Sequence, residues 1–547
     1  MLNPARNGVF DVIIRNATLI DGSGGLARTG DLGIAGDRIT AIGTIEADAA
    51  AIRTIDAAGR VVCPGFIDIH THSDLTLLED GVGESKLRQG VTTEVVGNCS
   101  FAAFPIEPER LDLHADHLAR ATAPITPWWT DFDGYADALT ERGLAINVAP
   151  LAGHGTLRVA AMGVDERPAT ADELSRMERD LDRALQQGAF GMSTGLTHVP
   201  SSYGDFDEVA ALARVLASHG ALYATHARAI APDEGAAVAE AIEIGRRTGV
   251  TVEFSHLAIN RPDRWGHGAE LLAMFDAARD EGIDIFFDVY PYAASSSSLT
   301  QYLPPWLQAG GTQAMRARLE DPDQRQRALA DMAEGWFSGI PWLWDRFVVS
   351  SCPDGYGVTK TLEELSVSEG VEPYELTLQL CERYGNELQV VLFYRSEDDV
   401  AKFVAHPLSV IGSDGNAIPL EQPTACPHPR NFGTFPRVLG MYARDEGVLD
   451  LVNAVRKMTA EPARRLGLTD RGTLAVGAVA DVVVFDPATV IDNSEFGQRA
   501  EPPTGIDVVI VCGRVVLEAG TIGHDRPGQV LRRLPSRSSV SSIGSAD

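Results

Sequence analysis

The stretch RTGVTVEFSH (residues 247–256) contains the pattern that decides the fold. A helical, charged stretch ends at Gly249, and an apolar run follows it. Glycine just after a helix tolerates the left-handed conformation that ends the helix, so the pattern predicts a helix and then a strand. The same pattern recurs at Gly90, Gly143, Gly188, Gly220 and Gly282. Because strands buried on both faces are apolar almost throughout, the repetition predicts an α/β fold with a (β/α)8 TIM-like barrel.

Side chains that bind metal ions follow several of these apolar runs. Cys99, His226, His256 and Asp414 each come directly after a predicted strand. The carboxyl ends of barrel strands meet on one face, where barrel enzymes place their active sites. We therefore expect these four side chains to lie on one rim of the barrel.

Two more histidines end an earlier apolar run, in GFIDIHTH (residues 65–72). Residues i and i+2 of a strand point to the same side, so one strand end can present both His70 and His72 to a single ion. Imidazole is the commonest protein ligand for zinc-like metals, and hydrolases use such metals to activate water near neutral pH.

Each of these residues also has an ordinary structural explanation. A buried cysteine commonly acts as a small apolar residue, a single histidine can be a satisfied core residue, and Asp414 in SDGN can belong to a turn. Six such residues on one predicted rim favour a metal site, because the joint pattern is far more specific than any one motif.

Composition and charge limit the class of protein. The chain has 547 residues and a formal net charge of −30, which argues against a nucleic-acid partner because phosphates require a basic surface. The six cysteines are scattered, and the N-terminus lacks a basic and apolar signal pattern. No apolar run is long enough to span a bilayer. We expect a soluble, cytoplasmic protein that binds a small molecule, and the sequence leaves its oligomeric state open.

Taken together, the motifs resemble the amidohydrolase superfamily and, more closely, the D-aminoacylase (N-acyl-D-amino-acid deacylase) family. The resemblance extends from about residue 11 to about residue 520. The matching motifs are PGFIDIHTHSD (64–74), VVGNCS (95–100), GHGTLR (153–158), MSTGL (192–196), THAR (225–228), IGSDG (411–415) and HPRNFGTFPRVLG (428–440).

The two chain ends contain short alternating stretches that are typical of small antiparallel sheets. The resemblance implies that residues 1–62 and 461–530 together form one small β-sandwich beside a barrel at 63–460. A break in the pattern at about 295–344 predicts an insertion, either a lid or pocket wall or a surface decoration. The Ser-rich segment 531–547 is expected to be disordered.

The resemblance also implies which residues bind metal. Many amidohydrolases bridge two metals with a carbamylated lysine, but none of the four lysines of this chain lies on a suitable strand. Cys99 is the replacement that the resemblance implies. The tight zinc site would contain Cys99, His226 and His256. A weaker second ion would be held by His70, His72 and the shared Cys99, with Asp414 as a further ligand.

This site predicts hydrolysis of a C–N bond, most simply an amide. A zinc ion with an open position lowers the pKa of its water to about 7, and Asp414 is placed to transfer the proton to the leaving nitrogen. Cyclic amide or imide hydrolysis and deamination are alternatives within the superfamily. A scaffold without catalysis is a further alternative, which the retention of all six residues disfavours.

Substrate recognition departs from the family pattern. D-aminoacylases hold the substrate carboxylate with a lysine two residues after the second single histidine, and this chain has Ala258 there. The resemblance suggests Tyr290 or Tyr292 and Ser296 as further substrate contacts. Two arginines, Arg228 and Arg430, are candidate replacement cations, although each could instead brace the barrel loops. The sequence leaves the acyl group, the side chain and the stereochemistry of the substrate open.

Overall fold

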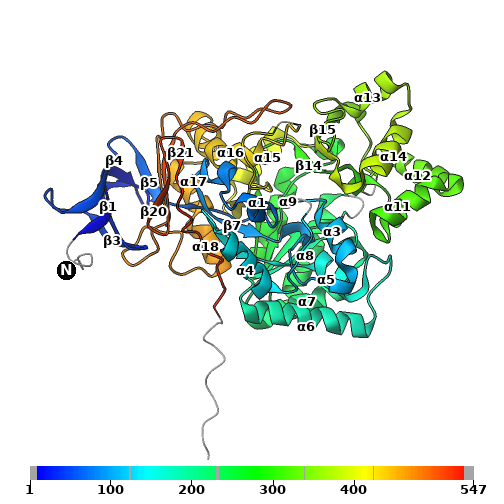
Figure 1. Ribbon diagram of the computed structural model, residues 1–547, viewed down its shortest axis with the longest axis horizontal. Helices are drawn as coiled ribbons and strands as arrows, with labels where there is room; N and C mark the ends of the chain where they lie inside the picture. Colours follow the sequence, from blue (N-terminus) through cyan, green and yellow to red (C-terminus); the bar gives the residue numbers. More distant parts are fainter. Residues whose placement is uncertain (1–8, 122–124, 230–232, 338, 423, 535–547) are drawn as a thin grey trace, which may run out of the picture.

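The computed structural model describes residues 9–121, 125–229, 233–337, 339–422 and 424–534. Figure 1 shows a β-rich part at one end, a barrel of strands and helices in the middle, and a mainly helical lobe at the other end. None of the described helices is both long enough and apolar enough to cross a membrane.

Eight parallel strand positions form the predicted barrel. The strands β6–β7–β8 pair in one set, and β9–β10–β11–β12–β13–β17 pair in another. Only Leu151 separates β8 from β9, which together form the third position. A bridge between Thr71 and Gly415 joins the first position to the last and closes the ring. The barrel strands are β6 (Phe66–Asp68), β7 (Val91–Val96), β8 (Asn147–Pro150), β9 (Ala152–Gly153), β10 (Gly191–Gly195), β11 (Leu222–His226), β12 (Thr251–Phe254), β13 (Ile285–Val289) and β17 (Ser409–Ile411).

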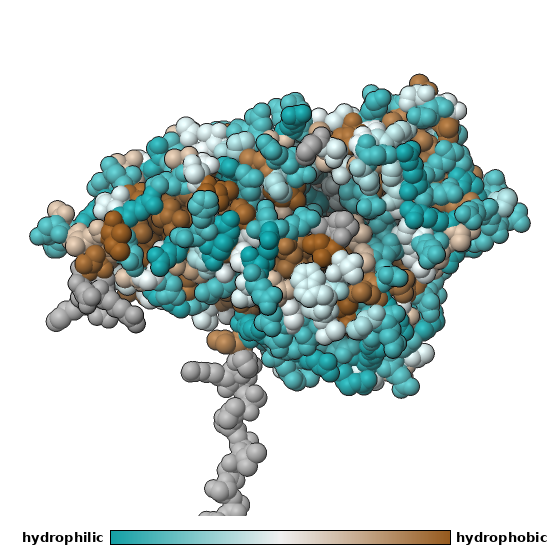
Figure 2. Space-filling view, in the orientation of Figure 1, coloured by the Kyte–Doolittle hydropathy of each residue, from teal (hydrophilic) through white to brown (hydrophobic). Residues whose placement is uncertain are grey.

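The six glycines mark the joins between helices and strands, as predicted. Each has a positive φ, from 61° at Gly220 to 117° at Gly188, which a residue with a Cβ rarely adopts. The helices that precede these glycines are α2 (Glu84–Leu87), α4 (Phe132–Arg142), α6 (Ala171–Gln187), α7 (Phe206–His219), α8 (Glu234–Thr248) and α9 (Gly268–Asp280). Along α6 and α7 the outer surface is hydrophilic (Figure 2), while Leu181 and Leu212 are buried.

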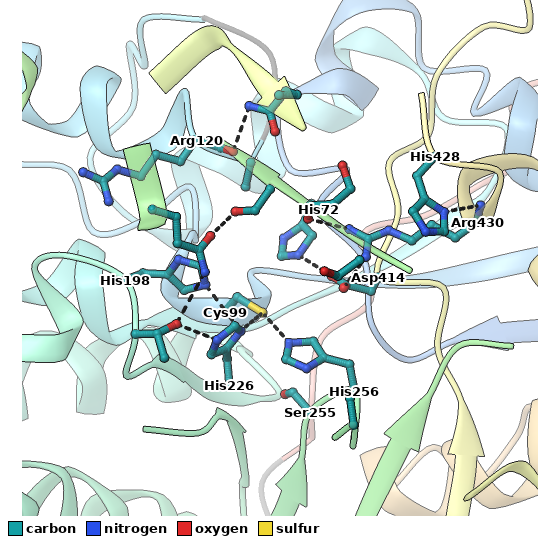
Figure 3. Close-up of a pocket in the computed structure, with 18 of the residues that line it drawn as sticks. His72, Cys99, Arg120, His198, His226, Ser255, His256, Asp414, His428 and Arg430 are labelled. Atoms are coloured by element: carbon teal, nitrogen blue, oxygen red, sulfur yellow. Dashed lines mark hydrogen bonds and ion pairs between the residues drawn. The ribbon is translucent and has the colours of Figure 1, made fainter. Parts of the chain in front are cut away.

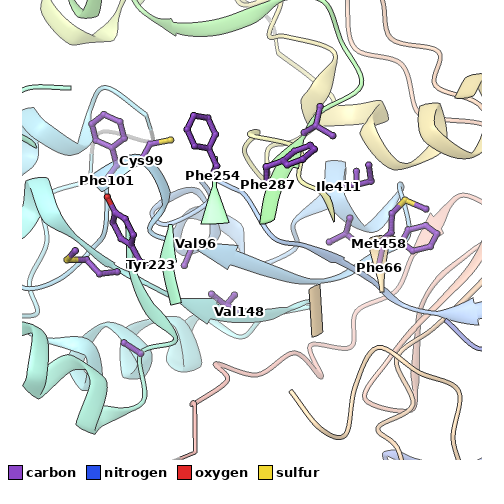
Figure 4. Close-up of a cluster of buried hydrophobic side chains, with 14 of the residues drawn as sticks. Phe66, Val96, Cys99, Phe101, Val148, Tyr223, Phe254, Phe287, Ile411 and Met458 are labelled. Carbon is purple, nitrogen blue, oxygen red and sulfur yellow. The ribbon is translucent and has the colours of Figure 1, made fainter. Parts of the chain in front are cut away.

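Side chains from successive barrel strands pack with the surrounding helices into one apolar core. Val96, Val148, Phe254 and Phe287 belong to one buried cluster that also contains Cys99 (Figure 4). Cys99, a residue that can bind metal, therefore lies at the edge of a tightly packed apolar core.

The two chain ends combine into one sheet that folds over its own core, which confirms the predicted β-sandwich. Strand β5 pairs antiparallel with β18, so the first and last parts of the chain share one hydrogen-bonded ladder. Ile14 and Leu32 share an apolar cluster with Val484 and Ile510. The strands are β1 (Phe10–Leu19), β2 (Arg28–Ala35), β3 (Arg38–Gly43), β4 (Ala51–Asp56), β5 (Val61–Pro64), β18 (Val482–Phe485), β19 (Ile506–Val511), β20 (Arg514–Glu518) and β21 (Thr521–Ile522).

The insertion is longer than the expected 295–344. Strands β13 and β17 are direct neighbours in the barrel, so everything between them departs from the barrel sheet. Buried apolar residues of the insertion, from Leu299 to Tyr394, form a cluster separate from the barrel core. The insertion is therefore a lobe with its own core. The lobe contains β14 (Ser295–Ser298), α10 (Pro305–Gln308), α11 (Gly311–Glu320), α12 (Pro322–Ala333), β15 (Phe347–Ser351), α13 (Leu362–Glu369), α14 (Pro373–Tyr384) and β16 (Gln389–Leu392). Helix α15 (Glu397–Ala405) then leads back to the barrel.

Two expected boundaries differ from the structure. Helix α18 (Ala460–Leu466) buries Leu466 in a cluster with barrel residues, so the barrel continues beyond residue 460. The segment expected to be disordered at 531–547 begins with ordered residues: the Leu531 N–H donates to the Val148 carbonyl at 2.7 Å, and the Arg533 N–H donates to the Gly188 carbonyl at 2.8 Å. Residues 535–547 lie outside the described residues.

A fully buried ammonium group supports the rim of the barrel. Lys86 Nζ on α2 donates to Asp68 Oδ2 at 2.8 Å and to Ser413 Oγ at 2.6 Å. The Glu94 carboxylate lies 3.2 Å away. None of these charged side chains is exposed to solvent. Asp68 is two residues before His70, and Ser413 directly precedes Asp414. This cluster therefore fixes the two sides of the ring closure.

Removal of the ammonium should therefore destabilise the protein strongly. We expect Lys86→Met to lower the stability by about 3–5 kcal/mol, because two buried carboxylates would lose their counter-charge. Lys402→Met is the matched control: Lys402 makes a surface pair with Asp398 at 3.0 Å, a type of pair that contributes about 0.3–0.5 kcal/mol. Thermal unfolding of both variants measures the difference. Equal midpoints for K86M and wild type would contradict the assignment.

Candidate metal centre and active-site cavity

The predicted metal-binding residues lie together on the carboxyl rim of the barrel (Figure 3). His70 is fully buried, and the exposed fractions of Cys99, His72 and Asp414 do not exceed 7 %. Cys99 Sγ is 3.3 Å from His70 Nε2, 3.7 Å from His226 Nδ1 and 3.5 Å from His256 Nε2. Zinc ligated tetrahedrally by sulfur and nitrogen at its usual bond lengths separates these atoms by about 3.5 Å. The spacing therefore fits metal ligands of this type.

The donor atoms form two groups that share Cys99. Within each group the donor atoms all lie within 4.8 Å of one another. The groups are His70, Cys99, His256 and Asp414, and Cys99, His198 and His226. This division differs from the expected one, in which Cys99, His226 and His256 hold the tight ion and His70 and His72 hold the weaker one.

His198 is a donor that the sequence reasoning missed. It follows β10 by three residues, and its Nε2 is 3.4 Å from His226 Nδ1. Its exposed fraction is 5 %, and its Nδ1 makes no hydrogen bond within the described part of the chain. The sequence contained a pattern that could have identified it, because His198 follows an apolar barrel strand as the other donors do.

Neighbouring polar groups orient the histidines. Asp288 Oδ2, on β13, is 3.0 Å from His70 Nδ1, so Nε2 of that ring faces the Cys99 sulfur. Thr197 Oγ1 is 2.6 Å from His226 Nε2, which turns His226 Nδ1 toward the sulfur. Metal-binding histidines are commonly held in this way through their second ring nitrogen. Asp288 was not identified from the sequence, since an acid inside a strand gives no local signal.

Burial sets the protonation of the donors. It lowers the pKa of His226 to about 3 and lowers those of His198 and His256 well below the usual value, so these rings are neutral and have a free lone pair. Burial also raises the pKa of the Cys99 thiol to about 11, although the charge of His70 opposes the rise. A bound cation would reverse this, because coordination deprotonates a thiol.

Asp414 is held as a carboxylate at the centre of the site. Its Oδ1 accepts from His72 Nε2 at 2.9 Å, and its Oδ2 accepts from Arg430 Nη1 at 2.6 Å. Burial opposes ionisation, but the Arg430 guanidinium and the His72 hydrogen bond hold the pKa of Asp414 well below its usual value.

Strained backbone marks the same residues. The φ angles of Cys99, His256 and Asp414 are 52°, 38° and 51°, and that of Ser100 is 74°. Residues with a Cβ adopt such angles at a cost of order 1–3 kcal/mol and do so mainly where function requires it. These backbone conformations direct the side chains of Cys99, His256 and Asp414 into one space.

A cavity of about 510 Å³ opens above the donors. His72, Cys99 and Asp414 line its floor, whereas His70 lies behind them. The inserted lobe supplies an apolar wall to this cavity, formed by Tyr302, Trp336, Phe337 and Ile340. The insertion is thus a pocket wall rather than a surface decoration.

The expected substrate contacts separate into two sets. Tyr290 and Ser296 line the cavity, and the buried Tyr290 hydroxyl has no hydrogen-bond partner in the described residues. Tyr292 instead directs its hydroxyl to Asp492 Oδ2 at 3.2 Å. The two arginines line the cavity but are engaged elsewhere: Arg228 pairs with Glu240 at 3.2 Å, and Arg430 pairs with Asp414.

Comparison with known proteins agrees with this architecture. The amidohydrolase family model matches residues 53–517. The chain is 38 % identical to N-acyl-D-glutamate deacylase of Alcaligenes xylosoxydans xylosoxydans over 526 residues, which cover 96 % of this chain and 97 % of that protein.

Solved structures give the same assignment. N-acyl-D-glutamate deacylase of Bordetella bronchiseptica, complexed with zinc and a phosphonate inhibitor, has a TM-score of 0.81 and 35 % identity, covering 96 % of this chain and 99 % of that one. A D-aminoacylase structure has a TM-score of 0.79 and 35 % identity, covering 96 % of this chain and 100 % of that one. That enzyme has a binuclear metal centre in which one metal activates and the second attenuates. With its barrel, its rim of donors and these full-length matches, the chain belongs to the amidohydrolase family.

Proposed function

We propose that this protein is a zinc-dependent hydrolase of amide C–N bonds that deacylates N-acyl-D-amino acids or related N-acyl compounds. The observation that carries this proposal is the arrangement at Cys99: its sulfur is surrounded by imidazole donors beside an ionised carboxylate, at the floor of an open cavity. The deacylases of glutamate and other D-amino acids among its relatives support the same reaction class.

The donor set fits zinc. A neutral imidazole and a thiolate are preferred ligands, and the distances between donors suit a tetrahedral ion. One ion would be held by His70, Cys99, His256 and Asp414 and another by Cys99, His198 and His226, whereas His72 would act through its hydrogen bond to Asp414. When bound, zinc polarises the substrate carbonyl and lowers the pKa of water to about 7.

The residues of the chain perform the proton transfers. Asp414 would take a proton from the attacking water and return it to the leaving nitrogen. Arg430 keeps the carboxylate ionised before it accepts the proton, and His72 fixes the orientation of Oδ1. The apolar wall of the lobe limits access of bulk water to the bound substrate.

The state of the cysteines fits a reducing compartment. All six cysteines lie within the described residues and are free thiols, which is the usual state in the cytoplasm. We therefore include a cytoplasmic location in the proposal.

Chiral analysis of products tests the activity. Zinc-loaded protein should release free D-amino acid from N-acetyl-D-amino acids and none from the L-enantiomers. Asp414→Asn should lower kcat by about 10²–10⁴-fold at matched zinc loading, because positioned acid–base catalysis contributes that much. Ring opening of cyclic amides, or release of ammonia from an aromatic amine, would point to the alternative activities of the superfamily.

Loss of the shared sulfur should abolish metal binding. We expect Cys99→Ser to lower the zinc content by at least tenfold, measured by elemental analysis after dialysis, because a neutral hydroxyl would replace the thiol that both donor groups share. Cys426→Ser, a change of a partly exposed thiol outside the donor set, is the control and should keep its zinc. Stoichiometric zinc in C99S would contradict the assignment.

The acid limb of the pH profile depends on Arg430. Activity requires ionised Asp414 and is lost as the pH falls through the pKa of this group. Since Arg430 lowers that pKa, Arg430→Met should raise it and move the acid limb of kcat/KM to higher pH. Profiles of wild type and R430M from roughly pH 3 upward measure the shift, because the wild-type limb is expected below the ordinary carboxyl pKa of about 4 and the R430M limb above it. An unchanged acid limb would show that Asp414 does not set it.

A further inference from the structure

Five arginines line the cavity, and most of them are already engaged. Arg430 pairs with Asp414, Arg228 with Glu240, and Arg261 with Asp263 at 3.4 Å. Arg120 also forms no ion pair in the described residues, but it is buried, donates to Gln308 Oε1 at 3.0 Å, and extends away from the metal donors in Figure 3. The fifth cavity arginine is Arg395, at the junction between the inserted lobe and α15.

Arg395 forms no ion pair with any acidic group in the described residues. Its Nε is 3.4 Å from Asn260 Oδ1, and its guanidinium lies over the Tyr290 ring, 4.4 Å from the centroid. Both contacts orient the cation without neutralising it. A half-buried arginine that lines a cavity in this way keeps most of its paired hydrogen-bond donors for a ligand.

The position of Arg395 is close to the alanine that interrupts the family pattern. Asn260, its contact, is two residues from Ala258, and both residues line the cavity. Position 258 is where the resemblance places a cation for the substrate carboxylate. The chain therefore lacks a cation at position 258 of the barrel loop. Arg395, at the end of the inserted lobe, places one beside the same loop.

Arg395 and Tyr290 border the same space, because both line the cavity and the Arg395 guanidinium lies over the Tyr290 ring. The buried Tyr290 hydroxyl has no hydrogen-bond partner in the described residues. A carboxylate at this place would accept hydrogen bonds from both Arg395 and Tyr290.

We propose that Arg395 is a specificity-determining residue that binds a carboxylate group of the N-acyl substrate from the inserted lobe, in place of a lysine at position 258. The inference rests on the proposed deacylase function and names its substrate class: an N-acyl compound with a free carboxylate near the scissile amide. The guanidinium can bind that carboxylate through two parallel hydrogen bonds.

Kinetics with matched substrates test the inference. N-acetyl-D-leucine has an α-carboxylate, and N-acetyl-D-leucinamide has none. N-acetyl-D-isoglutamine carries only a side-chain carboxylate, and N-acetyl-D-glutamine carries only the α-carboxylate. Arg395→Met should lower kcat/KM for the recognised acids by roughly 10- to 100-fold, the usual effect of a charge-assisted contact, mainly through KM. The leucinamide should change less than about threefold.

Two further variants separate recognition from structure. Ala258→Lys in the R395M background returns a cation to the same wall and should recover part of the lost kcat/KM for the acids only. Arg261→Met removes a cavity arginine that already has an acidic partner, and it should leave the preference for acids unchanged. Zinc content and thermal midpoint should match wild type in each variant.

The outcomes are distinct. A loss restricted to N-acetyl-D-leucine and N-acetyl-D-glutamine assigns Arg395 to the α-carboxylate, and a loss restricted to N-acetyl-D-isoglutamine assigns it to the side chain. Equal losses for acids and for the leucinamide, or none, would overturn the inference while leaving the deacylase function in place. Failure of zinc-loaded wild type to cleave any of the four compounds would overturn the proposed function and this inference with it.

Discussion

Closure of the barrel between its first and last strands is the constraint on which the site depends. The Asp414 N–H donates to the His70 carbonyl at 2.8 Å, and the His72 N–H donates to the Gly415 carbonyl at 3.0 Å. These bonds place the carboxylate against two histidines that are 342 or more residues away in the chain. The buried Lys86 ammonium neutralises Asp68 of the first strand and Glu94 of the second, and it donates to Ser413 beside the last strand. Without the closure, the donors would be unpaired polar groups at the top of an apolar core.

The buried environment also prepares the donors for a cation. Histidines that are kept neutral by burial have free lone pairs, and a thiol whose pKa is raised needs a positive ion to become a strong ligand. Asp414 must be charged to accept a proton, and Arg430 holds it in that state. The same low-dielectric surroundings therefore favour metal binding and preserve a general base, because each group has a different set of neighbours.

Chemistry and recognition come from different parts of the chain. The barrel strands position every donor, while the inserted lobe supplies the apolar wall and ends next to Arg395. A lobe with its own core can change its cavity-facing residues without disturbing the rim. The loss of a cation at Ala258 and the presence of one at Arg395 fit this division, since both positions border the same space.

The sequence by itself determined the barrel, the joins at the six glycines and five of the six grouped donors, because helix ends, apolar strands and the residues that follow them are local patterns. The resemblance to the family implied the shared sandwich. Only the tertiary structure decided how the donors are grouped, that His198 joins them, that Asp288 orients His70, and that the insertion extends well beyond residue 344. It also showed Arg430 paired with Asp414 and Arg395 left without an acidic partner in the described residues. These are contacts between residues far apart in the chain, and no local pattern encodes the distance between two side chains that meet only when the ring of strands has closed.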